Sequence, residues 1–84
     1  MYLVYVLYSE KFQKIYVGFT SNIEERLRSH NEFSKKGWTI KFKPWELIYK
    51  EEHLLKSDAM KREKELKTAA GGKFIWSLIN NAEV

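Results

Sequence analysis

The stretch YLVYVLYSEKFQKIYVGFTSNIEERLRSHN, residues 2–31, sets the pattern for the rest of the chain. Two segments in it, Tyr2–Tyr8 and Lys14–Gly18, are rich in Val, Ile, Leu and Tyr, which suit a pleated, half-buried surface. Only five residues separate them, too few for a parallel crossover, so we predict an antiparallel hairpin with Gly18 ending the second strand. Apolar residues occupy both faces of the first strand. We therefore expect cover on both sides, or tyrosines that line a cleft.

The residues after the hairpin predict a helix that runs to about residue 30 or 31. The segment Ser21–Glu24 matches a capping box, in which the serine hydroxyl accepts from the third helical amide and Glu24 reaches back. Arg26 and His30 are four residues apart, so they lie on the same side of this helix. Gly18 would then be needed where the backbone passes close to the helix.

A third strand and a second helix follow in the next part of the chain. Pro44 cannot donate to a sheet ladder, so we expect it to begin a strand or lie at its edge. Alternation of side chains predicts this strand over Trp45–Glu51. Ser57 or Asp58 can cap the second helix, which we expect to end near Lys67.

The last part of the chain predicts one more helix. Gly71-Gly72 should break the second helix, and Phe74–Asn80 is apolar enough to form a short final helix that packs inward. The predicted fold class is α+β, an α/β sandwich with a small three-stranded antiparallel sheet flanked by helices in the order β-β-α-β-α-α. With 84 residues, the chain is expected to form a single domain over 1–84.

Composition excludes several classes of protein. The sequence contains no cysteine, which excludes disulfides and thiolate metal sites and fits a reducing compartment. No apolar run approaches the ~20 residues that a membrane span needs. The N-terminus has neither the basic segment nor the cleavage site of a signal peptide. We therefore expect a cytoplasmic protein with no membrane partner.

The net charge of +4 is concentrated in one segment. Between Glu32 and Glu46 the chain carries four lysines and no acid, whereas basic and acidic residues balance elsewhere. Positive charge beside an aromatic residue suits a polyanion, which predicts a nucleic-acid contact. A solubilising loop is the alternative. The residues concerned are Lys35, Lys36, Trp38, Lys41 and Lys43.

Five segments together resemble the GIY-YIG nuclease superfamily, in particular its small single-domain bacterial members. The first motif, Leu3-Val4-Tyr5, keeps only the tyrosine of Gly-Ile-Tyr, and the second, Tyr16-Val17-Gly18, keeps two of three letters. The segments Glu25–Asn31, Lys43–Tyr49 and Met60–Lys67 follow in the order and at about the spacing of those proteins. The resemblance implies a nuclease that acts on nucleic acid.

Glu63 is the carboxylate that the resemblance assigns to a metal ion, Mg²⁺ or Mn²⁺. On the second helix Glu63 borders the buried side, while Glu65 lies about 200° around the helix. One carboxylate suffices because Mg²⁺ accepts only one or two from a protein and keeps several waters. The alternative is a surface glutamate paired with Arg62 or Lys67.

The resemblance also implies catalytic roles for Arg26, Tyr5 and Tyr16, with assistance from His30. The planar guanidinium of Arg26 can hold two phosphate oxygens, and His30 can exchange a proton near neutral pH. A free phenol has a pKa of about 10, so we expect the tyrosines to orient the water and the scissile group. Each residue has a structural alternative: a surface arginine, a histidine at a helix C-terminus, and two core tyrosines.

The sequence thus predicts a metal-dependent endonuclease that hydrolyses phosphodiester bonds with low sequence specificity in DNA repair or processing. DNA is favoured over RNA, no small-molecule cofactor is expected, and a protein partner would supply specificity. The first alternative is a catalytically silent nucleic-acid-binding module of the same fold. The second is a protein-interaction adaptor that uses an exposed sheet edge.

Overall fold

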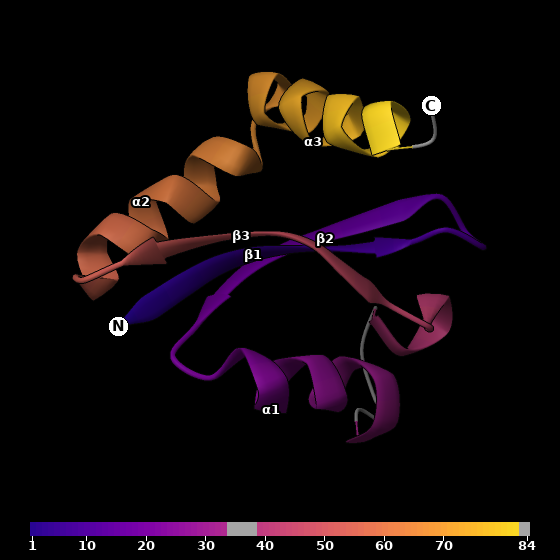
Figure 1. Cartoon of the computed structure of the whole chain (residues 1–84), viewed down its shortest axis with the longest axis horizontal. Helices are drawn as coiled ribbons and strands as arrows, with labels where there is room; N and C mark the ends of the chain where they lie inside the picture. Colours follow the sequence, from indigo (N-terminus) through magenta and orange to yellow (C-terminus); the bar gives the residue numbers. More distant parts are fainter. Residues whose placement is uncertain (34–38, 83–84) are drawn as a thin grey trace.

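Three strands form one antiparallel sheet with the hairpin's first strand at its centre (Figure 1). β1 (Tyr2–Ser9) pairs with β2 (Lys14–Thr20) on one edge and with β3 (Glu46–His53) on the other. This computed structural model describes residues 1–33 and 39–82. Within them, three α-helices accompany the sheet, so the predicted α+β fold and its order β-β-α-β-α-α are confirmed.

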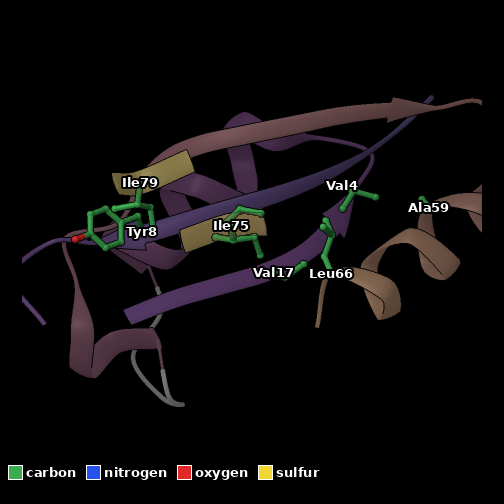
Figure 2. Packing of buried hydrophobic residues seen from close by; sticks show 8 residues of the cluster. Val4, Tyr8, Val17, Ala59, Leu66, Ile75 and Ile79 are labelled. Carbon is green, nitrogen blue, oxygen red and sulfur yellow. The ribbon is translucent and has the colours of Figure 1, made fainter. Parts of the chain in front are cut away.

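The two faces of the sheet are covered by different helices. In Figure 1, α1 (Ile23–Arg28) lies on one side, and α2 (Lys56–Leu66) and α3 (Ala69–Ala82) lie on the other. Because successive side chains of β1 alternate between faces, its apolar residues fill both layers. The α2–α3 face, shown in Figure 2, buries Val4, Val6, Tyr8, Val17, Ala59, Leu66, Ile75 and Ile79.

The opposite, α1 face buries Tyr5, Leu7 and Trp45 against half-buried aromatic and aliphatic side chains. The expectation that both faces of the first strand are covered is therefore confirmed.

The hairpin is longer than the sequence predicted. β2 does not end at Gly18 but runs to Thr20, because Phe19 and Thr20 still pair with β1. Gln13 closes the turn with a φ of 54°, uncommon for a residue with a side chain. Its Nε2 donates to the hydroxyl of Tyr8 at 2.9 Å and to a backbone carbonyl in the turn at 2.8 Å. These bonds fix the hairpin tip.

The predicted caps of α1 and α2 are both wrong. Asn22, not Ser21, caps α1, and its Oδ1 accepts from the backbone N–H of Glu25 at 3.1 Å. Because β2 continues to Thr20, the first helical turn begins one residue later. α2 already begins at Lys56, so Ser57 and Asp58 lie inside its first turn, and no side chain caps it.

The ends of α1 and of β3 also differ in detail. The helical path of α1 continues as a π-helical turn over Ser29–Phe33, slightly beyond the predicted end. β3 begins at Glu46 and extends to His53, so it starts one residue later and ends two residues later than expected. Among the described residues, no helix is both long and apolar enough to cross a membrane.

Gly71-Gly72 does not break α2, as the sequence had suggested. α2 ends at Leu66, as expected, and α3 starts at Ala69, so both glycines lie in its first turn. A Cβ on Gly71 would clash with the backbone oxygen of Glu65 and the backbone of Leu66, whereas one on Gly72 would meet nothing within 4 Å. Gly71 is thus required by the close approach of α3 to the end of α2.

This difference predicts opposite effects of the same substitution at neighbouring positions. Gly71→Ala should lower the free energy of unfolding by about 1–3 kcal/mol, because the new methyl group overpacks against the backbone. Gly72→Ala should raise it by about 0.5–1 kcal/mol through the better helix propensity of alanine. Urea denaturation followed by circular dichroism measures both. Equal effects of the two substitutions would contradict the close approach at Gly71.

Candidate active site

The hairpin places two tyrosine rings side by side on the α1 face of the sheet. Tyr5 of β1 lies opposite Gly18, and Tyr16 of β2 lies opposite Leu7, so both side chains point toward α1. Their ring centroids are 6.2 Å apart. The two motifs of the sequence therefore meet at one place in the fold.

His30 completes a cluster of three rings. A hydrogen bond of 3.2 Å joins its Nε2 to the hydroxyl of Tyr5, and its ring centroid lies 4.7 Å from that of Tyr16. The imidazole is buried. The π-helical turn carries His30, and the next residue, Asn31, anchors that turn. The side chain of Asn31 donates to the backbone carbonyl of Trp45 at 3.0 Å and accepts from its N–H at 2.6 Å.

Asn31 is a residue of the site's supporting structure that the sequence did not single out. It belongs to the segment Glu25–Asn31 that carried the resemblance, but only the fold shows that its amide holds the start of β3. Trp45 is fixed a second time, because its indole N–H donates to the carbonyl of Thr39 at 2.8 Å. These bonds connect the His30 turn to the buried layer beneath Tyr5 and Tyr16.

Gly18 leaves the space that the Tyr5 ring occupies. A Cβ at this position would lie 2.7 Å from the Tyr5 hydroxyl oxygen, 2.8 Å from its Cζ and 3.1 Å from a ring carbon of Tyr16. The sequence predicted that glycine is needed for a close helix. That reason is wrong, because the nearest neighbours are the two catalytic candidates themselves.

Arg26 and Glu63 approach this cluster from different helices. Arg26 is exposed on α1, one turn before His30. Glu63, on α2, keeps 17 % of its side chain exposed, and its Oε1 accepts from Nζ of Lys67 at 2.8 Å. Both charges act on the Tyr5 hydroxyl, so the structure brings all five predicted site residues into one electrostatic neighbourhood.

The protonation states of the cluster follow from burial and these charges. Burial is the main reason why the pKa of Tyr5 rises to about 12, with Tyr16 and Glu63 raising it further and Arg26 opposing them. Burial, followed by the positive charge of Arg26, lowers the pKa of His30 from its ordinary value of 6.5. At neutral pH Tyr5 therefore keeps its proton and His30 is neutral.

The site residues differ in access to solvent. The Tyr5 side chain is fully buried, whereas Tyr16 is half-buried and Arg26 is exposed. Solvent therefore reaches Tyr16 and Arg26 but not the side chain of Tyr5.

The predicted nucleic-acid contacts are only partly within the described residues. Lys41 and Lys43 are exposed, in and just after a 3₁₀ turn over Thr39–Phe42. Lys35, Lys36 and Trp38 lie outside the described residues.

The family model described as the GIY-YIG catalytic domain matches residues 1–73. This chain belongs to the GIY-YIG family. The membership confirms the resemblance seen in the sequence and gives a nuclease-type fold with nucleic acid as the implied substrate. The match ends within α3, so it covers the strands and helices that carry all five site residues.

Small bacterial proteins are similar to this GIY-YIG chain. The UPF0213 protein SH2523 of Staphylococcus haemolyticus is 40 % identical over 58 residues, which cover 69 % of this chain and 71 % of that protein. The UPF0213 protein SERP0126 of Staphylococcus epidermidis is 37 % identical over 54 residues, or 64 % of this chain and 66 % of that protein.

A solved structure shares the fold. The solution NMR structure of the UPF0213 protein BH0048 from Bacillus halodurans superimposes with a TM-score of 0.54 at 25 % sequence identity. The alignment covers 93 % of this GIY-YIG chain and 85 % of that protein.

Proposed function

We propose that this GIY-YIG protein is a metal-dependent endonuclease that hydrolyses phosphodiester bonds in nucleic acid, DNA in preference to RNA. The observation that supports the proposal is that four different side chains act on the Tyr5 hydroxyl, one through a hydrogen bond and three through its pKa. That hydroxyl is hydrogen-bonded to His30, and its pKa responds to Tyr16, Arg26 and Glu63. A carboxylate that can hold a metal ion, a guanidinium and a neutral imidazole can together stabilise phosphate charge and accept a proton, as phosphodiester hydrolysis requires.

Glu63 fits a divalent metal ion of the Mg²⁺ or Mn²⁺ type. No group of three or more metal-binding side chains exists among residues 1–33 and 39–82, and such ions use one or two carboxylates and several waters. Lys67 occupies one oxygen of Glu63, but 53 % of its side chain is exposed. An exposed pair one helical turn apart is weak and can be displaced by a metal ion. When bound, the metal ion would stabilise charge on the phosphate oxygens and lower the pKa of a water.

Arg26 and Tyr16 would contact the substrate directly. The exposed guanidinium of Arg26 can hold two oxygens of the scissile phosphate as negative charge grows on them. Tyr16 is half-buried, whereas Tyr5 is fully buried, so we assign Tyr16 to the attacking water. This assignment separates the roles of the two tyrosines, which the sequence alone left open.

His30 would accept a proton during the reaction, and Tyr5 would position His30. With a lowered pKa, His30 is neutral at pH 7 and can accept the proton that leaves the water. Tyr5 keeps its own proton because its pKa is about 12. Its hydroxyl oxygen can accept from the Nε2–H of His30, which orients the ring and leaves Nδ1 as the nitrogen that takes the proton from the water. We therefore describe Tyr5 as a positioning residue.

This division of roles predicts how activity depends on pH. Protonated His30 cannot accept a proton, so the cleavage rate should fall as pH drops through the lowered pKa of His30. Above pH 6.5 the rate should no longer depend on His30 protonation. Arg26→Gln removes one cause of the lowering and should move the His30 titration to higher pH. Proton NMR of the imidazole measures this shift without activity. A His30 that titrates above 6.5 in the unmodified protein would contradict the assignment.

The proposed activity is tested with purified protein and labelled nucleic acids. Duplex, branched and single-stranded DNA, and RNA, are incubated with Mg²⁺, with Mn²⁺ and with a chelator. We expect cleavage of DNA that the chelator abolishes, with little sequence preference. Absence of cleavage on every substrate, together with salt-sensitive binding, would support the catalytically silent module, which the Lys67–Glu63 ion pair also favours.

The cellular setting follows from this proposal. Nucleic-acid contact through Lys41 and Lys43 goes to the phosphate backbone and does not distinguish bases. A partner protein would then select the target. We propose DNA repair or processing in the cytoplasm as the setting.

A further inference from the structure

A row of aromatic side chains leads from the Tyr5–Tyr16–His30 cluster to the tip of the hairpin. Tyr16 lies 6.4 Å from Trp45 between ring centroids, and Phe42 packs against the buried layer that Trp45 belongs to. At the far end, Phe42 and Phe12 meet edge to face with centroids 5.5 Å apart. Phe12 comes from the hairpin turn and Phe42 from the 3₁₀ turn, 30 residues later. We call this pair the tip platform.

Positive charge surrounds the tip platform. Nζ of Lys11 lies 5.4 Å from the ring centroid of Phe12, and Nζ of Lys14 lies 5.6 Å from that of Phe42. Lys41 and Lys43 flank Phe42 in the sequence, and all four lysines are exposed. The hairpin thus adds two cations that the basic segment in the sequence did not reveal.

Two acids also lie at this end of the molecule. Glu10 and Glu46 border a hollow of about 610 Å³ together with Tyr8, whose side chain packs on the α2–α3 face. Lys11 borders the same hollow. The four lysines around the tip platform outnumber these two acids, so its neighbourhood keeps a net positive charge.

The tip platform lies in line with the proposed site. Every second residue of β2 lies on the same face of the sheet, and on the α1 face these residues are Gly18, Tyr16 and Lys14. They pair with Tyr5, Leu7 and Ser9 of β1. Four residues of strand span about 13–14 Å. At about 3.4 Å per stacked nucleotide, this corresponds to about four nucleotides between the site and the tip.

We infer that the tip platform binds an unpaired nucleic-acid strand that leaves the site along β2. Lys11 and Lys14 hold its phosphates, and the exposed face of Phe12, 38 % accessible, stacks on a base. A base inside a duplex has both faces covered by its neighbours, whereas an unpaired base offers its own face to the ring. The inference deepens the proposed nuclease function by giving its substrate class: nucleic acid with a single-stranded tail or branch.

The test measures binding rather than cleavage. Fluorescence anisotropy with the Glu63→Gln protein compares a blunt DNA duplex with the same duplex carrying a tail of about six nucleotides. A third probe carries the tail without bases. We expect the tail with bases to bind tightest, and Phe12→Ala to weaken that complex by about five- to a hundredfold. The blunt and base-free probes should be unaffected by Phe12→Ala.

The chain offers a matched control for the ring. Phe74 is 39 % exposed and stacks edge to face on Tyr49, but it belongs to α3 on the other face of the sheet. Phe74→Ala should leave all three affinities unchanged, and Phe12→Tyr should keep the preference for the tail. Lys14→Gln should weaken the binding of both tailed probes. It should also reduce the slope of log K against log salt concentration by about 0.7, the value for one phosphate contact on a single strand.

Two results would overturn the inference. One is equal affinity of the Glu63→Gln protein for tails with and without bases, a comparison that does not depend on whether the Phe12 variant folds. The other is an equal effect of Phe12→Ala and Phe74→Ala. Failure of the unmodified protein to cleave any substrate would refute the nuclease proposal and leave these binding comparisons in force.

Discussion

Glu63→Gln is expected to lower the rate of phosphodiester cleavage by about a hundred- to ten-thousandfold while DNA affinity changes little. The amide has nearly the size of the carboxylate, so the half-buried position in α2 keeps its packing, but the negative charge for a metal ion is lost. The expected loss corresponds to the several kcal/mol that a metal ion contributes to phosphate charge stabilisation. Single-turnover cleavage of labelled DNA in Mg²⁺ measures it.

A second readout of the same variant does not require activity. The charge of Glu63 helps to raise the pKa of Tyr5 to about 12, so the neutral amide should lower that pKa. Spectroscopic titration of the phenols reports the change. An unaltered Tyr5 titration would contradict the electrostatic contact between α2 and the ring cluster.

Glu65→Gln is the matched control for this prediction. It removes the same charge from the same helix, two residues away, where the carboxylate pairs with Arg62 at 3.2 Å. Its cleavage rate should stay within about twofold of the unmodified protein, since exposed ion pairs contribute little. Equal losses at Glu65 and Glu63 would indicate a general effect of charge on DNA binding and would refute the metal assignment.

Gly18→Ala is expected to reduce cleavage by about a hundredfold. The added methyl group would lie 2.7 Å from the Tyr5 hydroxyl oxygen and 2.8 Å from Cζ, so the ring must move. Its hydrogen bond to His30 is then lost or lengthened, and misplacement of a catalytic group by about 1 Å can cost that factor. Overpacking should also lower the free energy of unfolding by about 1–3 kcal/mol.

Activity and stability are compared in the same preparation of this variant. Gly72→Ala introduces the same methyl group where nothing lies within 4 Å, and it should keep full activity. The imidazole signals of His30 should shift in Gly18→Ala and remain in place in Gly72→Ala. Full cleavage by a folded Gly18→Ala protein would show that the Tyr5–His30 contact is dispensable.

The sheet was predictable because its signal is local. Alternating apolar residues in Tyr2–Tyr8 specified a strand covered on both faces, and the short connection specified a hairpin. Helix starts were not predictable, since Ser21 and Asn22 are both good caps. The backbone N–H of Asn22 donates to Oγ1 of Thr20 at 3.0 Å, a contact that depends on where β2 stops.

The glycines show why residue type alone was misleading. Gly71 and Gly18 were each interpreted by their usual local roles, as a helix breaker and as a strand end. In the fold, both are set by contacts with other segments: the end of α2 for Gly71 and the Tyr5 ring for Gly18. Such contacts exist only after the chain has packed.

The membership of the candidate site stays a prediction, while its arrangement became visible only in the fold. The family resemblance supplied Tyr5, Tyr16, Arg26, His30 and Glu63, and each interacts with or belongs to the Tyr5 neighbourhood. The complete burial of Tyr5 and the pairing of Phe12 with Phe42 could not be predicted. Both arise where the hairpin meets a turn that lies far away in the sequence.

The two hydrogen bonds between Asn31 and Trp45 make the segment between them a suitable position for an insertion. They hold the chain at fixed points before and after the intervening residues, while His30 and β3 keep their positions. An inserted segment would depart and return at the same clamp. Each doubling of its length would cost only about 0.6 kcal/mol in closure entropy, so a recognition module could be accommodated there with the catalytic rings undisturbed.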